Sequence, residues 1–380
     1  MKRLVLCACL MGCAPSLSLL PRRVEVGRSV VHIPLELVNH MPFINASVGH
    51  GPALRGLVDT GAGGLLLTPH GGEVARIPTH AQTLLVNGVD GTERRSMTVA
   101  KVKRLRIDRV VLDDVNALVV PDLGELAQVV GEPVDVVLGG MLFAPSLVTL
   151  DLEAGALTLE HGVLEDGPSV LAATFESDVP HVRITVAGIT MSAVVDTGCS
   201  GWLGLPQDLE AQLPLQRPAR PGPKHIGVNG EGRDRWARLS GTVRLGPYAI
   251  VDTPVDFTAG EPRVCAQLLR YFRVTLDRVS SRVRFARDDQ QPIVVAAERT
   301  TGLGLLKRDG VWVVADLIPG VAPEGVALFD VVEHFDGKLA AALTRGDWID
   351  AQRGDHVHVG LKREGRRIEL DVPVREVGSF

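Results

Sequence analysis

The chain is poor in cysteine and in aromatic residues. Its 380 residues include five cysteines, two tyrosines and four tryptophans, and aromatic residues make up 4% of the total. Cys7, Cys9 and Cys13 lie close to the N-terminus, which leaves Cys199 and Cys265 in the body of the chain. This usage argues against a multi-cysteine zinc site and a C-x-x-C redox motif. The histidines also lack the H-E-x-x-H spacing of a metalloprotease, so the sequence predicts neither a metal nor a cofactor.

An excess of basic charge is missing as well. Lys and Arg total 40 against 45 for Asp and Glu, and the formal net charge is −5. The basic run from Lys101 to Arg109 alternates with apolar residues, as the solvated face of a strand does. We therefore expect no nucleic-acid partner.

Long apolar runs are also absent. The apolar stretch from Leu4 to Met11 follows Met1-Lys2-Arg3 and is too short to cross a bilayer, which is the layout of a signal peptide. The segment Leu10-Met11-Gly12-Cys13 resembles a bacterial lipobox, which implies that Cys13 becomes the lipidated first residue. We expect residues 1–21 to form this leader and the rest of the chain to lie in the periplasm or cell envelope, with membrane contact only through the lipid. Ordinary signal cleavage nearby, giving a soluble secreted protein, is the alternative.

The sequence does contain a repeated turn. Leu57-Val58-Asp59-Thr60-Gly61-Ala62 is matched by Val194-Val195-Asp196-Thr197-Gly198-Cys199 in the second half of the chain. Each copy is typical of a strand that enters a tight turn, where glycine can take backbone angles closed to other residues. A single Asp-Thr-Gly is a common turn tripeptide, in which the Asp accepts backbone hydrogen bonds. Two copies indicate a duplicated domain only if the segments on either side of the turn are repeated as well.

The flanks do repeat, in the same order. In each half a strand-like run precedes the turn, a Gly-rich segment that favours a hairpin follows it, and an apolar strand closes the half. In the first half an apolar-apolar-Gly segment also precedes the closing strand. These segments are Met41–Val48, Val86–Gly91, Val136–Gly140 and Leu147–Asp151 in the first half, and Val179–Val186, Val228–Gly232 and Phe272–Asp277 in the second.

This combination resembles the pepsin and retropepsin group of aspartic peptidases over about residues 30 to 290. The resemblance implies a mainly β, bilobal acid protease fold, with lobes at 22–165 and 166–292. It implies that Asp59 and Asp196 share one water, that Thr60 and Thr197 lock the turns together, and that Gly61 and Gly198 complete them. A peptide or protein substrate would lie extended under two flaps, which contain Gly88 and Gly91 in the first lobe and Asn229, Gly230 and Gly232 in the second.

The chemistry explains why two carboxylates are needed. Peptide hydrolysis without a metal or nucleophilic side chain needs one group to take a proton from water and another to donate one to the carbonyl oxygen. Two carboxyls about 3 Å apart cannot both ionise cheaply, so they hold one proton between them. The sequence therefore predicts an exported aspartic endopeptidase with Asp59 and Asp196 as its catalytic pair.

The chain departs from the family pattern in three places. Cys265 stands where the first half has Gly139, Cys199 follows the second turn, and neither flap contains a tyrosine, which makes the site more similar to retropepsins. Cys199 and Cys265 are either two small buried residues or a linked pair beneath the turn.

A different unit begins near residue 293. Gly302-Leu303-Gly304-Leu305 is followed by Val311–Val314, Ile318–Gly320, Asp330–Val332 and Val357–Leu361. This order resembles an α/β PDZ domain over 293–377, although Phe329 stands where a glycine is usual. The resemblance implies that the loop from Gly302 to Leu305 holds the C-terminal carboxylate of a peptide ligand. A packing module that binds no peptide is the alternative.

The sequence is also compatible with other interpretations. An actin-like ATPase also carries two Asp-x-Gly loops, but it needs substantial helices between them. A catalytically inactive peptide-binding or scaffold protein would keep the same fold. Lobes that pair between chains rather than within one chain are a third possibility.

Overall fold

The computed structural model describes residues 19–27, 30–87, 94–121, 127, 130, 132–140, 146–227, 230–308 and 310–376. Cys13 and most of the leader lie outside these residues, as do Gly88, Gly91 and Asn229 at the flap tips. In the described ranges, the helices are all too short or too polar to cross a membrane.

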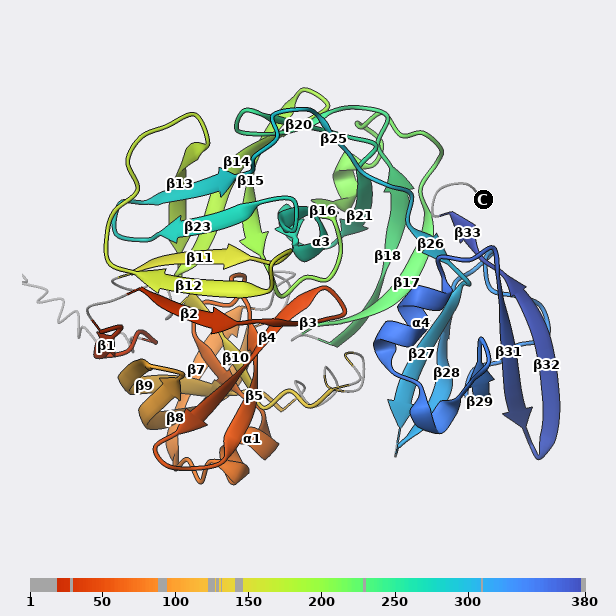
Figure 1. The fold of residues 1–380 in the computed structure, drawn as a ribbon, viewed down its shortest axis with the longest axis horizontal. Helices are drawn as coiled ribbons and strands as arrows, with labels where there is room; N and C mark the ends of the chain where they lie inside the picture. The colour runs from red at the N-terminus through yellow and green to blue at the C-terminus, as the bar shows by residue number, and fades with distance from the viewer. Residues whose placement is uncertain are drawn as a thin grey trace, which may run out of the picture.

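The first lobe is a closed barrel (Figure 1). Its hydrogen-bonded path runs β1-β9-β6-β10-β5-β4-β8-β7, and a further β8–β9 pairing closes it. Strand β10 is buried along its whole length because it lies between β5 and β6. The strands are β1 (Arg23–Glu25), β3 (Glu36–Val38), β4 (Met41–Val48), β5 (Ala53–Val58), β6 (Leu65–Leu67), β7 (Thr79–Asn87), β8 (Arg94–Ile107), β9 (Val110–Val119) and β10 (Val136–Leu138), with one short helix, α1 (Pro69–Val74).

The second lobe repeats this plan in the order β17-β18-β21-β16-β22-β15-β14. Its β22 runs parallel to β15 and antiparallel to β16, as β10 does with β5 and β6. The elements are β14 (Val179–Val186), β15 (Ile189–Asp196), β16 (Leu203–Pro206), η2 (Gln207–Leu209), β17 (Arg220–Gly227), β18 (Gly230–Arg238), β19 (Val243–Leu245), β20 (Tyr248–Val251), β21 (Pro254–Thr258), β22 (Arg263–Cys265), α3 (Ala266–Leu269) and β25 (Ile293–Val294).

A shared layer of six strands joins the lobes. Its order is β2-β12-β11-β23-β24-β13, formed by β2 (Val31–Pro34), β11 (Leu147–Asp151), β12 (Ala156–Glu160), β13 (Val170–Glu176), β23 (Arg273–Asp277) and β24 (Arg282–Ala286). At its centre β11 pairs with β23, and Thr149 lies opposite Thr275 with their hydroxyl oxygens 2.9 Å apart. These two threonines are equivalent in the repeat, so the pseudo-two-fold axis passes between them. The mainly β, bilobal fold class is confirmed.

The C-terminal unit has its own sheet and its own core (Figure 1). The sheet order is β27-β28-β29-β31-β32, and Trp312, Phe335 and Leu361 are among its buried side chains. Its elements are β26 (Arg299–Thr300), β27 (Leu303–Arg308), β28 (Val311–Leu317), β29 (Val331–Phe335), β30 (Lys338–Leu339), η3 (Ala340–Ala342), α4 (Arg345–Ala351), β31 (His356–Arg363), β32 (Arg366–Pro373) and β33 (Arg375–Glu376). Upstream of this unit, β25 still pairs with β20 of the second lobe.

Candidate active site

The two Asp-Thr-Gly turns meet at the interface of the lobes and exchange hydrogen bonds. The backbone N–H of Thr60 donates to the Thr197 hydroxyl and the N–H of Thr197 donates to the Thr60 hydroxyl, each at 3.0 Å. The Thr60 hydroxyl then donates to the carbonyl oxygen of Val195, and the Thr197 hydroxyl donates to that of Val58 at 2.7 Å. Both threonines are almost completely buried, so water cannot replace these partners.

Each aspartate is held by its own turn. Asp59 accepts a hydrogen bond from the N–H of Gly61 at 2.8 Å. Asp196 accepts two, from Gly198 at 2.9 Å and from Cys199 at 3.1 Å. The two carboxyls are also hydrogen-bonded to each other. Because β5 and β15 end at these turns, the pair of strands brings one carboxyl from each lobe to a common point.

Gly61 and Gly198 are needed for a different reason from the one that the sequence predicts. Neither Gly61 nor Gly198 has a positive φ, so the expectation of glycine-only backbone angles is wrong. A Cβ at Gly61 would instead lie 2.6 Å from Oδ1 of Asp196, and a Cβ at Gly198 would lie 2.3 Å from the Cγ of Asp59. Each glycine is needed because the opposite lobe's carboxyl occupies the space of its missing side chain.

The environment raises the pKa of both carboxyls unequally. Burial, followed by the charge of Asp196, raises the pKa of Asp59 to about 8. Burial also raises the pKa of Asp196, but Arg263 and the N–H groups of Gly198 and Cys199 oppose that rise. Asp59 is therefore the partner that holds the shared proton, and Asp196 is the partner that holds the charge.

Arg263 was not identified from the sequence. It lies on β22 opposite Val194, and its charge favours the ionised form of Asp196 more than that of Asp59. By sheet register its counterpart in the first lobe is Val137. The sequence does contain one indication of this role. Arg263 is a cation in β22, whereas the equivalent strand β10 is entirely apolar.

Cys199 and Cys265 form a disulfide beneath the second turn. In the first lobe the equivalent Gly139 donates its N–H to the carbonyl of Gly64 at 3.1 Å, and a Cβ there would lie 2.2 Å from the Ala62 carbonyl oxygen. The segment between the aspartate and the next strand is one residue longer in the second lobe than in the first. In the second lobe the N–H of Cys265 donates to the carbonyl oxygen of Trp202 at 2.9 Å. We attribute the room for a side chain at Cys265 to that extra residue.

The predicted flaps are antiparallel hairpins as far as they are described. β7 pairs with β8 in the first lobe, and β17 pairs with β18 in the second. Gly230 and Gly232 lie at the start of β18, opposite Gly227 and His225. Gly88, Gly91 and Asn229, which the sequence predicts to contact substrate, lie outside the described residues.

The loop predicted to hold a peptide carboxylate already has internal hydrogen bonds. The N–H of Gly302 donates to the Thr300 hydroxyl at 3.0 Å, and that of Leu303 donates to the Thr301 hydroxyl at 3.4 Å. Gly302 has a positive φ of 76°, and a Cβ there would lie 2.5 Å from the backbone N of Ala322. The remaining positions, Gly304 and Leu305, form the bulged start of β27. This loop and the two aspartates lie in separate units.

One protein-family model matches part of the chain. Residues 44–142 match a family model described as aspartyl protease, which covers the first lobe from β4 through Asp59 to β10. The search of curated proteins found no match. The family match supports a protease function, and it covers one of the two turns.

Replacing Thr60 tests the contact between the turns. Thr60→Ala leaves the buried N–H of Thr197 and the carbonyl of Val195 without partners, and we expect it to lower the free energy of unfolding by about 2–4 kcal/mol. Thr60→Ser keeps the hydroxyl and should retain most of the stability. Urea denaturation measures both, and equal stability of the two variants would show that these bonds contribute little.

Proposed function

We propose that this chain is an aspartic endopeptidase. The observation that carries the proposal is the pair of hydrogen-bonded carboxyls, Asp59 and Asp196, contributed by two lobes and differing in their affinity for a proton. The aspartyl protease family match over the first lobe supports the same conclusion.

The geometry suits activation of a water molecule. The Asp196 carboxylate accepts a proton from a water between the two carboxyls while Asp59 donates its proton to the carbonyl oxygen of the substrate. The water oxygen bonds to the carbonyl carbon and a tetrahedral intermediate forms without a covalent enzyme species. Asp196 then donates its proton to the leaving amine, the C–N bond breaks, and the proton on the intermediate's hydroxyl returns to Asp59. The pair ends in its starting protonation state.

The substrate we propose is a peptide or protein segment in extended conformation. The hairpins β7–β8 and β17–β18 offer strand hydrogen-bonding groups to such a segment, as in β-augmentation. An inactive peptide-binding scaffold would have the same fold. Only a measurement of peptide cleavage therefore distinguishes the scaffold from the enzyme.

Neutral replacement of either aspartate tests catalysis directly. Asp59→Asn and Asp196→Asn should each reduce cleavage of a diverse peptide library by about 10³-fold or more, because one step of proton transfer is lost. Asp108→Asn, in the exposed turn between β8 and β9, is the matched control and should keep full activity. Circular dichroism verifies that the variants are folded. Equal cleavage by wild type and both site variants would refute the enzyme assignment and leave the scaffold.

The pH profile tests the unequal proton affinities. Activity needs a protonated Asp59, so it should fall as pH rises through about 8. It also needs an ionised Asp196, so it should fall as pH drops through the pKa of that group. Arg263→Met removes a charge that lowers this second pKa, and we expect the acid limb of kcat/KM to move to higher pH. Arg244→Met, at an exposed position on β19, should leave the profile in place, and an unmoved acid limb in Arg263→Met would contradict the assignment.

The C-terminal unit, in our proposal, is a PDZ-like module that binds peptide or regulates the protease. Among the described strands, β27 pairs with β28 and ends the path of the sheet, and this end is where we propose that an extended peptide is added. A terminal carboxylate would have to displace the threonine hydroxyls that now accept from Gly302 and Leu303. Phe329, in place of the usual glycine, keeps a positive φ of 70°.

One residue connects this module to the second flap. Asp316, on β28, accepts a hydrogen bond from the backbone N–H of Lys224 at 2.8 Å and forms an ion pair with Arg233. Gly304, in the predicted carboxylate loop, packs against the same residue, because a Cβ there would lie 2.7 Å from the Cβ of Asp316. Figure 1 shows the module beside β17 and β18. A peptide bound at β27 would therefore alter the position of the flap strands β17 and β18, because Asp316 contacts both the module and the flap.

Removing the Asp316 carboxylate tests this regulation. Asp316→Ala breaks both contacts with the flap, and we expect KM for a peptide substrate to change by at least about threefold, with kcat affected less. Asp371→Ala, on the far strand β32, removes an exposed carboxylate of the same module and is the control. An unchanged KM in Asp316→Ala would exclude this route.

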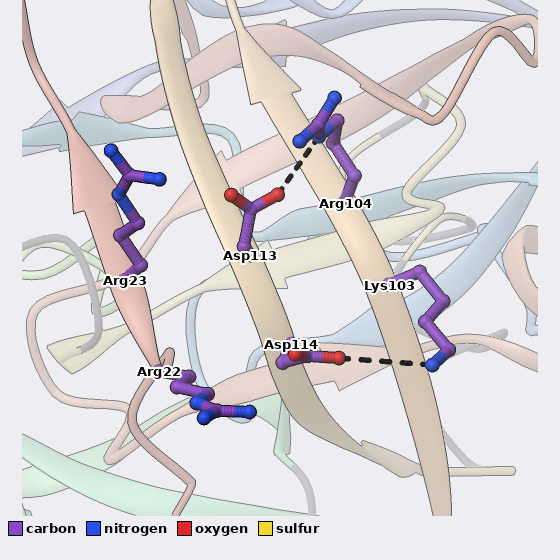
Figure 2. A pocket seen from close by; sticks show the side chains of 6 residues that line it. All are labelled: Arg22, Arg23, Lys103, Arg104, Asp113 and Asp114. Atoms are coloured by element: carbon purple, nitrogen blue, oxygen red, sulfur yellow. Dashed lines mark hydrogen bonds and ion pairs between the residues drawn. The ribbon is translucent and has the colours of Figure 1, made fainter.

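For the location of the protein, we propose a cell-envelope lipoprotein. Arg22 and Arg23 follow the predicted leader, and they line an open hollow of about 530 Å³ with Lys103 and Arg104. Figure 2 shows these cations around Asp113 and Asp114, and Asp113 pairs with Arg104 at 2.8 Å. The excess of positive charge beside the start of the mature chain suits a surface of anionic lipids.

Cell fractionation tests the lipid anchor. Cys13→Ser should move the protein from the membrane fraction to the soluble fraction, because the thiol that carries the lipid is lost. A change of nearby Ser16 to Ala is the control. Mass spectrometry of the wild-type N-terminus without a lipid on Cys13 would contradict the proposal.

A further inference from the structure

Three side chains on one face of the C-terminal sheet converge on one point. His334 on β29, His358 on β31 and Glu369 on β32 place their ligand atoms within 4.8 Å of one another. Oε2 of Glu369 lies 3.0 Å from Nε2 of His334 and 3.2 Å from Nε2 of His358. The two imidazole rings are stacked, with centroids 5.4 Å apart.

The strand register explains how His334 reaches across a strand. Gly360 on β31 lies opposite His334 on one side and opposite Glu369 on the other. A Cβ at Gly360 would lie 2.1 Å from Nε2 of His334. Glycine destabilises the interior of a strand relative to alanine, so its presence here needs a reason. The missing side chain lets the His334 ring lie over the middle strand and contact Glu369.

A second carboxylate lies beside His358. Asp371 lies opposite His358 in the register of β31 and β32, and its Oδ1 is 3.5 Å from Nδ1 of the ring. A proton on Nδ1, the ring nitrogen on the side of Asp371, would leave the lone pair of Nε2 facing Glu369. Histidines that bind metals characteristically have this arrangement, in which the second ring nitrogen donates to a carboxylate.

We propose that His334, His358 and Glu369 bind one Zn²⁺ ion. Two imidazole nitrogens and one carboxylate oxygen are ligands that suit zinc, whereas Mg²⁺ and Ca²⁺ favour oxygen ligands alone. Ligand atoms around a tetrahedral zinc lie about 3.3 Å apart, close to the two separations measured here. The side chains of His358 and Glu369 are half exposed, so water has access to the fourth position. This site is in a different unit from the two aspartates, and the inference does not depend on protease activity.

Zinc binding by the purified full-length chain tests the proposal. The protein is prepared without a polyhistidine tag, stripped of metal, and titrated with Zn²⁺ at pH 7.5 by calorimetry. We expect one equivalent to bind, with an affinity at least about tenfold weaker in His358→Ala and in Glu369→Gln. Asp371→Asn should weaken binding less than removal of a ligand does. His50→Ala, at an exposed turn between β4 and β5, is the control for adventitious histidine binding.

A spectroscopic measurement on the wild type gives a second, independent result. Co²⁺ in place of Zn²⁺ should give the intense visible absorption of a tetrahedral site, and excess Zn²⁺ but not Mg²⁺ should abolish it. Absence of binding, equal affinity in the ligand variants, or an equal loss in His50→Ala would overturn the proposal and leave a set of histidine–carboxylate hydrogen bonds.

Discussion

The buried exchange of hydrogen bonds between Thr60 and Thr197 is the contact on which the site depends. Two carboxyls in a poorly solvated place repel each other once both ionise, and free lobes would move apart to let water in. The threonine bonds oppose this because separation would leave four buried backbone groups without partners. The raised pKa values of Asp59 and Asp196 therefore depend on a contact between the turns that neither aspartate provides, and Arg263 with the N–H groups of Gly198 and Cys199 makes the two values unequal.

The sequence predicted the parts of the fold that repeat. Two copies of a turn, with flanks in one order, were sufficient for the bilobal class, for the placement of Asp59 and Asp196, and for the two hairpins. The proximity of Arg263 to Asp196 could not be predicted, because it depends on β22 pairing with β15 across a long stretch of chain. The cluster around His334 was missed for the same reason: its members come from three strands and share no motif spacing. Long-range register, which a single sequence does not encode in an obvious pattern, decided both.

The backbone beneath the turn is packed differently in the two lobes. Where Gly139 lets the backbone pass directly beneath the first turn, the second lobe has a longer turn and a covalent link between Cys199 and Cys265. The N–H of Cys199 also donates to Asp196, so the link restrains a residue that contacts the site itself. The Asp196 carboxyl accepts one more backbone N–H than the Asp59 carboxyl does, and the additional donor is Cys199 itself.

The Thr149–Thr275 contact bears on the origin of the molecule. A residue that faces its own equivalent across a two-fold axis is the hallmark of an isologous contact between identical subunits. Two identical subunits could form the same contact, because each would present the same strand edge to the other. Because both halves belong to one chain, each can carry its own residues, and a cysteine bridge in one half with a glycine in the other is a difference that two identical subunits could not have.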